Sequence, residues 1–150
     1  MDTKFKVKLA ITLSPRINIT PPEVIVSVPG YITHETLWKT KRIEAEFVGT
    51  TGFLDVKFFN KKYEETVGDK DMAVIVDQVE FFGISDPRFV WAGVYSPEYP
   101  EPWYSQQPTK PEPALTNHNY LGWNGRWHLE FDVPVFTWMH RTLGMGWIYS

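Results

Sequence analysis

The sequence predicts an all-β fold, an antiparallel β-sandwich that forms one domain over residues 1–150. Aromatic residues make up 16% of the chain, and 12 prolines and 10 glycines punctuate it. Apolar and polar residues alternate in several short runs, which is the pattern of half-buried strands. A chain of 150 residues buries roughly 70% of its unfolded surface, which is enough for one core.

The N-terminal half contains four such runs. Apolar residues at positions 5, 7, 9 and 11 alternate with lysines and predict a strand with one solvent-exposed face. A proline-containing turn over 14–22 leads to a strand over 23–28, which Pro29-Gly30 ends. The runs 43–47 and 54–58 are separated by the turn 49–52 and predict a β-hairpin.

The second half adds strands around a segment of different character. Residues 72–82 are nearly continuously apolar and predict a strand covered on both faces, and 89–95 is another strand candidate. In 96–124, six prolines lie among aromatic residues, a density that excludes regular structure. Strand patterns return in 126–149, with runs at 129–133, 135–139 and 146–149, so the chain predicts eight or nine strands.

Charge and composition exclude several classes of protein. The net charge is −3 and the basic residues are dispersed, so the basic patch of a nucleic-acid binder is missing. The N-terminal run alternates without a continuous apolar region, so we expect no signal peptide, and no stretch is long enough for membrane insertion. The chain has no cysteine, which removes disulfides, thiolate metal sites and cysteine nucleophiles.

The sequence lacks a recognisable catalytic motif. The histidines at 34, 118, 128 and 140 are dispersed, without a metal-binding spacing. The Gly-x-Ser-x-Gly motif of serine hydrolases does not occur. With 18 acidic residues, a carboxylate pair for glycoside hydrolysis can always be found and is uninformative. We therefore predict a protein with no catalytic residues.

Residues 3–84 show an ordered set of features: an opening strand, a Pro-Pro turn at 21–22, a strand ending at Gly30, a segment with Trp38 and a hairpin over 43–59. A more specific part follows, with a strand, an acidic loop and a second apolar strand, and carries Asn60, Tyr63, Asp71 and Asp77. This order resembles the calcium-dependent, xylan-binding carbohydrate-binding modules of families 36 and 60. The resemblance implies a jelly-roll β-sandwich, and residues 85–150 have no counterpart in it.

Two departures from the family pattern concern the acidic loop. Lys61 stands where the family has an acidic residue, and Met72-Ala73 replace an Arg-Asn pair. They leave the implied fold intact and weaken the implied calcium site.

The loop 64–71 is a candidate calcium site, because it carries four carboxylates and a glycine. Together with the resemblance, this makes the candidate ligands Glu64, Glu65, Asp69 and Asp71. The alternative is a solvated loop whose carboxylates are neutralised by the lysines at 61, 62 and 70. The spacing is not that of an EF-hand.

The proline- and aromatic-rich segment 96–124 is the candidate contact surface, and we expect it to be ordered, because disordered segments are depleted in aromatic residues. The candidate ligand or subunit contacts are Tyr99, Trp103, Tyr104, Tyr120 and Trp123. Their rings can stack on sugars. Alternatively, the segment is an arm that wraps a neighbouring subunit, or it folds back over an open edge of the sandwich.

The remaining expectations concern burial. The predicted core includes Val7, Leu9, Val26, Val56, Phe58, Val74, Val76, Leu129 and Phe131. Trp38, Trp91 and Trp138 lie inside strand-like runs and are expected in the core, whereas Trp103 and Trp123 are expected to be contact residues.

A sugar-binding type of domain that lacks an export signal and an attached enzyme is an unusual combination, and a bacteriophage particle, whose proteins reach the outside by cell lysis, accounts for it. We therefore expect a virion surface component, either a capsid decoration or part of a tail or fibre, that contacts host glycan. The alternative is a structural or cement protein that clamps neighbouring subunits without binding sugar. The expected partners are a glycan or virion subunits, in a homo-oligomer or a larger assembly.

Overall fold

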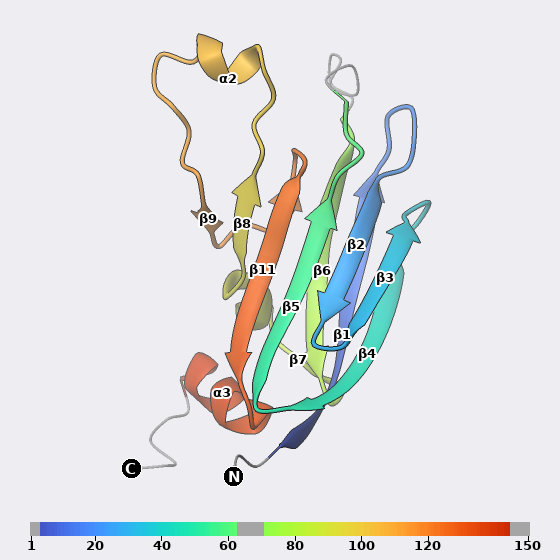
Figure 1. The fold of residues 1–150 in the computed structure, drawn as a ribbon, viewed down its shortest axis with the longest axis vertical. Coiled ribbons are helices and arrows are strands. Elements are labelled where there is room, and N and C mark those ends of the chain that lie inside the picture. Colours follow the sequence, from blue (N-terminus) through green and yellow to red (C-terminus); the bar gives the residue numbers. More distant parts are fainter. Residues whose placement is uncertain (1–3, 63–70, 145–150) are drawn as a thin grey trace.

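The computed structural model describes residues 4–62 and 71–144. Two antiparallel sheets face each other, which confirms the all-β sandwich (Figure 1). The five-stranded sheet has the order β10-β6-β1-β4, with β7 added at β6, and comprises β1 (Phe5–Arg16), β4 (Lys41–Gly49), β6 (Ala73–Phe81), β7 (Ile84–Ser85) and β10 (Tyr120–Leu121).

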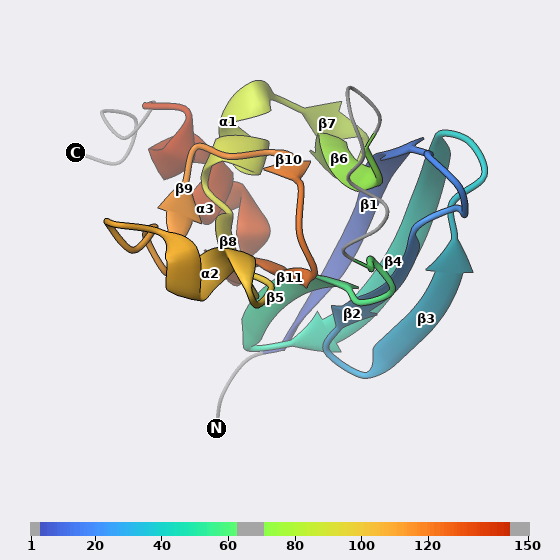
Figure 2. The same cartoon turned by 90° about the horizontal axis from the view of Figure 1, so that it is seen from above.

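The six-stranded sheet has the order β3-β2-β5-β11-β8-β9. Its strands are β2 (Glu23–Val28), β3 (Tyr31–Thr36), β5 (Thr51–Phe58), β8 (Val94–Pro97), β9 (Leu115–Thr116) and β11 (Gly125–Asp132). The helices of the described residues are α1 (Pro87–Trp91), α2 (Trp103–Gln106) and α3 (Val135–Thr142). They lie on the side of the sandwich away from β3 and β4 (Figure 2).

The core lies between the sheets, where the alternating runs turn their apolar positions inward. β1 lies between β6 and β4, and its residues Val7, Leu9, Ile11 and Leu13 are buried. All nine predicted core residues are buried. β1 extends through Pro15 to Arg16, so the first turn begins later than the proline at position 15 predicts.

The predicted hairpin over 43–58 is wrong. β4 pairs with β1, whereas β5 pairs with β2 and β11, so the turn after Gly49 carries the chain from one sheet to the other. Alternation identifies a strand and its buried face, but it does not identify the neighbouring strand. A hairpin forms instead between β2 and β3, where Gly30 adopts a φ of 78° that favours glycine.

Two segments predicted as strands contain helices. In 89–95, α1 precedes β8, because the Asp86 side chain caps the helix by accepting the Arg88 N–H at 2.9 Å and Pro87 begins it. In 135–139, α3 forms with Val135, Trp138 and Met139 buried at helical spacing. The run 146–149 lies outside the described residues.

These helices close one end of the core over four rings, Phe81, Phe89, Phe131 and Trp138, which we call the closed cluster. Their contacting ring centroids lie 4.9–6.0 Å apart, and all four rings are buried.

Burial confirms one of the three predicted core tryptophans. Trp138 is buried, but Trp38 is 70% exposed and Trp91 is 53% exposed. Trp38 lies in the connection between β3 and β4, and Trp91 is the last residue of α1, so neither is in a strand. An aromatic residue in an apolar run predicts burial only if the run is assigned to the right element.

The segment 96–124 contains more regular structure than its proline content predicts. It begins within β8, carries α2, and returns through β9, which pairs with β8, and β10, which pairs with β6. It therefore covers an edge of each sheet, as one of the three interpretations expected. Among residues 4–62 and 71–144, no helix is long and apolar enough to cross a membrane.

Candidate functional site

A long connection joins β8 to β11, and we call its residues 98–124, which carry α2 and the short strands β9 and β10, the excursion. Its two ends meet, because Pro97 pairs with Gly125, and a Cβ at position 125 would lie 2.4 Å from the Ser96 carbonyl oxygen. Buried Tyr95 holds the returning chain, since its hydroxyl donates to the Trp123 carbonyl and accepts the Trp123 N–H at 2.9 Å. The excursion projects beyond the strand ends (Figure 1).

Four of the five predicted contact residues come together on the excursion. Tyr99 stacks on Tyr104 at 6.0 Å and on Trp103 at 5.5 Å between ring centroids. Trp103 in turn lies 6.0 Å from Trp123. We call this series Tyr104, Tyr99, Trp103, Trp123 the aromatic ladder, and all four residues are half-buried. The fifth predicted residue, Tyr120, is in β10 and makes none of these ring contacts.

A lysine lies over each end of the aromatic ladder. The Lys110 ammonium is 4.6 Å from the Tyr104 ring centroid and donates to the Tyr104 carbonyl at 2.7 Å. The Lys61 ammonium is 4.3 Å from the Trp123 ring centroid. Both are cation–π contacts. Lys110 is exposed, but only 2% of the Lys61 side chain is accessible.

Lys61 is bound to the excursion through its backbone and its side chain. Its N–H donates to the Asn124 side-chain oxygen at 2.7 Å, and its carbonyl accepts from the Asn124 amide at 2.9 Å. Its ammonium donates to the Gly122 carbonyl and to the Asp71 carboxylate, with the latter at 2.6 Å. The segment that follows β5 is thereby fixed to Gly122 and Asn124, the two neighbours of Trp123.

Asp71 is the described member of the predicted calcium ligands. Its carboxylate accepts from Lys61 and from the Tyr120 hydroxyl at 2.7 Å, and it caps the Met72 N–H at 2.9 Å. Burial disfavours the charged form, but the hydrogen bonds from Lys61 and Tyr120 outweigh burial and lower the pKa of Asp71. Burial is the largest cause that raises the pKa of Tyr120, and the hydrogen bond to the Asp71 carboxylate is the second.

The other predicted ligands, Glu64, Glu65 and Asp69, lie outside the described residues. Within the described part of the chain, no three histidine, aspartate or glutamate side chains gather as a metal-binding group. The family-like Asn60 holds the start of β2, since its oxygen accepts the Glu23 N–H at 2.8 Å and its amide donates to the Pro21 carbonyl at 3.0 Å.

A hollow of about 510 Å³ adjoins the aromatic ladder. It is lined by Pro97, Tyr99, Tyr104, Lys110, Pro111, Glu112 and Pro113. The Tyr99 hydroxyl donates to the Glu112 carbonyl at 3.0 Å, and burial raises the pKa of Tyr99. The hollow offers ring edges, an ammonium and a carboxylate to a ligand that lies along the ladder.

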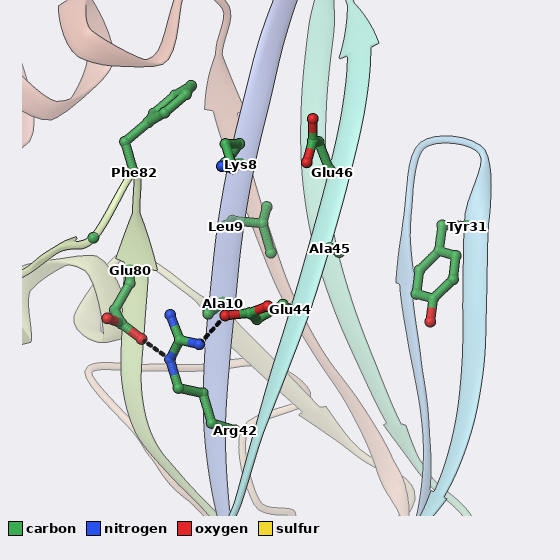
Figure 3. A pocket seen from close by; sticks show the side chains of 11 residues that line it. Lys8, Leu9, Ala10, Tyr31, Arg42, Glu44, Ala45, Glu46, Glu80 and Phe82 are labelled. Atoms are coloured by element: carbon green, nitrogen blue, oxygen red, sulfur yellow. Dashed lines mark hydrogen bonds and ion pairs between the residues drawn. The ribbon is translucent and has the colours of Figure 1, made fainter.

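A second hollow, of about 610 Å³, lies on the outer face of the five-stranded sheet (Figure 3). Arg42 crosses it and pairs with Glu44 and, at 2.7 Å, with Glu80. The hydrogen bonds that Arg42 donates to these carboxylates, the one to Glu80 foremost, raise the pKa of Arg42. Charges that satisfy one another on a strand face are ordinary surface pairs, so the aromatic ladder is the better candidate site.

Two facing antiparallel sheets make this chain a β-sandwich, and two solved structures of carbohydrate-binding modules share this fold. The structure of vCBM60 in complex with galactobiose is 17% identical, covers 83% of this chain and 97% of its own, and has a TM-score of 0.51. A selenomethionine form of vCBM60, described as linking two families of calcium-dependent carbohydrate-binding modules by circular permutation, is 16% identical.

This second structure covers 85% of this chain and 90% of its own, with a TM-score of 0.52. The resemblance to family 60 is therefore confirmed at the level of the fold, and it extends beyond residues 3–84, since 83% of the chain is a longer stretch. No family model matches the chain. A comparison with curated proteins also gives no match.

Four residues that hold or cover the aromatic ladder were not among the predicted contacts: Lys61, Tyr95, Lys110 and Asn124. Lys61 had a signal, because it departs from the family pattern at an acidic position. Tyr95 precedes the excursion in β8 and Asn124 is its last residue, but only the pairing of β8 with β11 brings them together. That pairing joins distant segments and leaves no trace in local periodicity.

Proposed function

We propose that the chain is a non-catalytic carbohydrate-binding-module-like domain that binds glycan along the aromatic ladder. The observation that carries this proposal is the ring series itself, with interplanar angles of 29° and 14° about Tyr99 and 41° between Trp103 and Trp123. A pyranose presents C–H bonds that pack on such ring faces. The likeness of the fold to vCBM60 supports the same proposal.

The polar groups beside the ladder fit a neutral, hydroxyl-rich ligand. Lys110 supplies donors and Glu112 supplies acceptors within the hollow that adjoins Tyr99 and Tyr104. Sites of this kind combine apolar surface with a few polar groups that fix orientation. The ladder is already ordered by Tyr95 and Asn124, so little conformational entropy is lost on binding.

A glycan array tests the proposal, followed by titration of the best glycan against wild type and two tryptophan variants. Trp103→Ala removes a central ring of the ladder and lowers affinity at least about tenfold, about 1.4 kcal/mol, as expected for an aromatic contact. Trp91→Ala is the matched control, because Trp91 is 53% exposed on α1 and is not part of the ladder. A wild type that binds no glycan, or equal affinity for both variants, would contradict the proposal.

A finer prediction concerns the biological setting. We propose a bacteriophage virion surface component, a capsid decoration or part of a tail or fibre, that contacts host glycan. The test is to assemble particles with and without this protein and to compare their attachment to cells that display the array-selected glycan. Attachment that is independent of the protein would count against this setting.

The alternative is a cement protein that clamps neighbouring virion subunits through the aromatic ladder. Such a protein would have a second apolar contact surface on the opposite side of the sandwich (Figure 2), since Ile32 on edge strand β3 is 70% exposed and Val48 on edge strand β4 is 62% exposed. In that case Trp103→Ala weakens self-association by about 2 kcal/mol. Sedimentation velocity of wild type and variant separates the clamp from the glycan site.

A further inference from the structure

Lys61, which follows the end of β5, is an unusual lysine, because its charged side chain is almost fully removed from water. Only 2% of its side chain is accessible. Lysine is almost never fully buried unless it is paired. Its ammonium donates to Asp71 at 2.6 Å and to the Gly122 carbonyl, and it lies 4.3 Å from the Trp123 ring. Each side of the ammonium is therefore matched by a carboxylate, a carbonyl or a ring face.

This surrounding is that of a bound cation. Calcium is held by carboxylate and carbonyl oxygens, and here the Lys61 ammonium already takes one oxygen from Asp71 and the carbonyl of Gly122. The other oxygen of Asp71 accepts the Tyr120 hydroxyl at 2.7 Å. Asp71 thus does not fit as a calcium ligand while Lys61 is in place.

The ammonium also connects three parts of the chain. Lys61 follows β5, Asp71 precedes β6, and the residues at 122 and 123 lead from β10 into β11. A cation that attracts all three fixes the returning end of the excursion against the sandwich, and with it the Trp123 end of the aromatic ladder.

We propose that the Lys61 ammonium is the structural cation of this site, and that it replaces calcium by holding Trp123 in place through Asp71 and Gly122. Its bearing on ligand affinity rests on the proposed glycan function. Its bearing on stability and on calcium does not.

The calcium arm of the test uses the wild-type protein. The melting temperature is measured in 5 mM EDTA and in a series of calcium concentrations. The series reaches roughly 100 times the Kd of a site whose Kd is micromolar to millimolar, because a ligand that binds only the folded state raises the melting temperature. The expected result is the same melting temperature throughout. A rise with calcium overturns the inference, since it would show a metal held by the predicted ligands Glu64, Glu65 and Asp69 despite Lys61.

The charge arm compares Lys61→Met with Lys62→Met. Lys62 is the exposed neighbour, so its variant keeps the wild-type melting temperature. Lys61→Met keeps the aliphatic stem but removes the ammonium from the Asp71 carboxylate, and the melting temperature falls by about 10 °C. Adding Asp71→Asn to Lys61→Met restores part of the loss, because the carboxylate that Lys61 neutralised is then uncharged. Equal melting temperatures for Lys61→Met and Lys62→Met overturn the inference, as does a double variant no more stable than Lys61→Met.

The ligand arm titrates the array-selected glycan against the same two lysine variants. Lys61→Met loses affinity at least about tenfold and Lys62→Met does not, because only the first releases Trp123. If the wild type binds no glycan, the proposed function fails, and the first two arms still decide the role of Lys61. If Lys61→Met does not fold, the calcium arm on the wild type decides it alone.

Discussion

The closed cluster and the aromatic ladder contain four rings each, at similar spacing, but they differ in cover. In the closed cluster, contacting centroids lie 4.9–6.0 Å apart, and α1 and α3 cover the buried rings. In the ladder, the corresponding distances are 5.5–6.0 Å, and the rings are half-buried with a lysine over each end. The closed cluster is three phenylalanines and a tryptophan, whereas the ladder is two tyrosines and two tryptophans, whose rings carry polar groups.

Ring orientation separates them further. Angles between ring planes in the closed cluster run from 37° to 78°, so edges meet faces and the space is filled. In the ladder the angles run from 14° to 41°, so neighbouring rings are closer to parallel and follow one another in a single row. The comparison teaches that aromatic rings are buried where helices cover them and stay partly exposed where only a lysine covers the end.

The largest effect should come from truncating the closed cluster. Phe81 is fully buried and contacts the other three rings, so Phe81→Ala creates a cavity and lowers the free energy of unfolding by about 3–5 kcal/mol. Phe136→Ala on α3 is the control, because Phe136 is 47% exposed. Urea denaturation measures both. Similar losses for the two variants would break the distinction between covered and open rings.

Trp103→Ala in the aromatic ladder should have a smaller effect on folding. Truncating a well-buried ring costs about 3 kcal/mol, but Trp103 is half-buried, and we expect a loss of about 1–2 kcal/mol. The same urea experiment measures it. A loss as large as that of Phe81→Ala would show that the ladder is part of the core rather than a contact surface.

The smallest effect concerns the helix that covers the closed cluster. Hydrogen bonds from the Arg88 side chain, and then from its N–H, lower the pKa of Asp86 to about 2. Because this pKa lies below the unfolded value of about 3.9, the contribution to stability is present above pH 4 and is lost as the pH falls toward 2. Arg88 also donates to the Leu143 carbonyl at 3.0 Å, so the pair joins α1 to the end of α3.

Asp86→Asn keeps a capping side chain but removes the charge. We expect wild type to be slightly more stable than the variant at pH 6 and equal to it near pH 2. Thermal melts across this range measure the difference. A difference that grows on acidification would contradict the assigned role of the Asp86 charge.

The sequence predicted the strands whose residues alternate, and failed where partners lie far apart. β1, β2 and β5 follow from period-two patterns, and β2 begins and ends at the predicted residues, Glu23 and Val28. The sheet change after Gly49 was not predictable, because alternation is the same in either sheet. The helix α1 was predictable in principle from Asp86-Pro87, but the apolar run after it favoured a strand.

For the candidate site, sequence reasoning identified the right residue type in the right segment. Tyr99, Trp103, Tyr104 and Trp123 were predicted contacts and do form one series, although their roles remain a prediction. What it could not provide is the arrangement around Lys61, since Asp71 and Asn124 lie 10 and 63 positions away in the sequence. The departure from the family pattern marked the position without showing what the lysine contacts.

The meeting of Pro97 with Gly125 at the base of the excursion has a consequence for how such a protein can diversify. Since the excursion starts and ends at one rung of the β8–β11 pair, its part between β8 and β9, which carries α2, can change in length and composition while β9, β10 and that rung stay paired. Descendants of this chain, or a designer's library built on it, can therefore exchange the residues around α2 between fixed ends. The sandwich then serves as a frame on which one displayed segment varies.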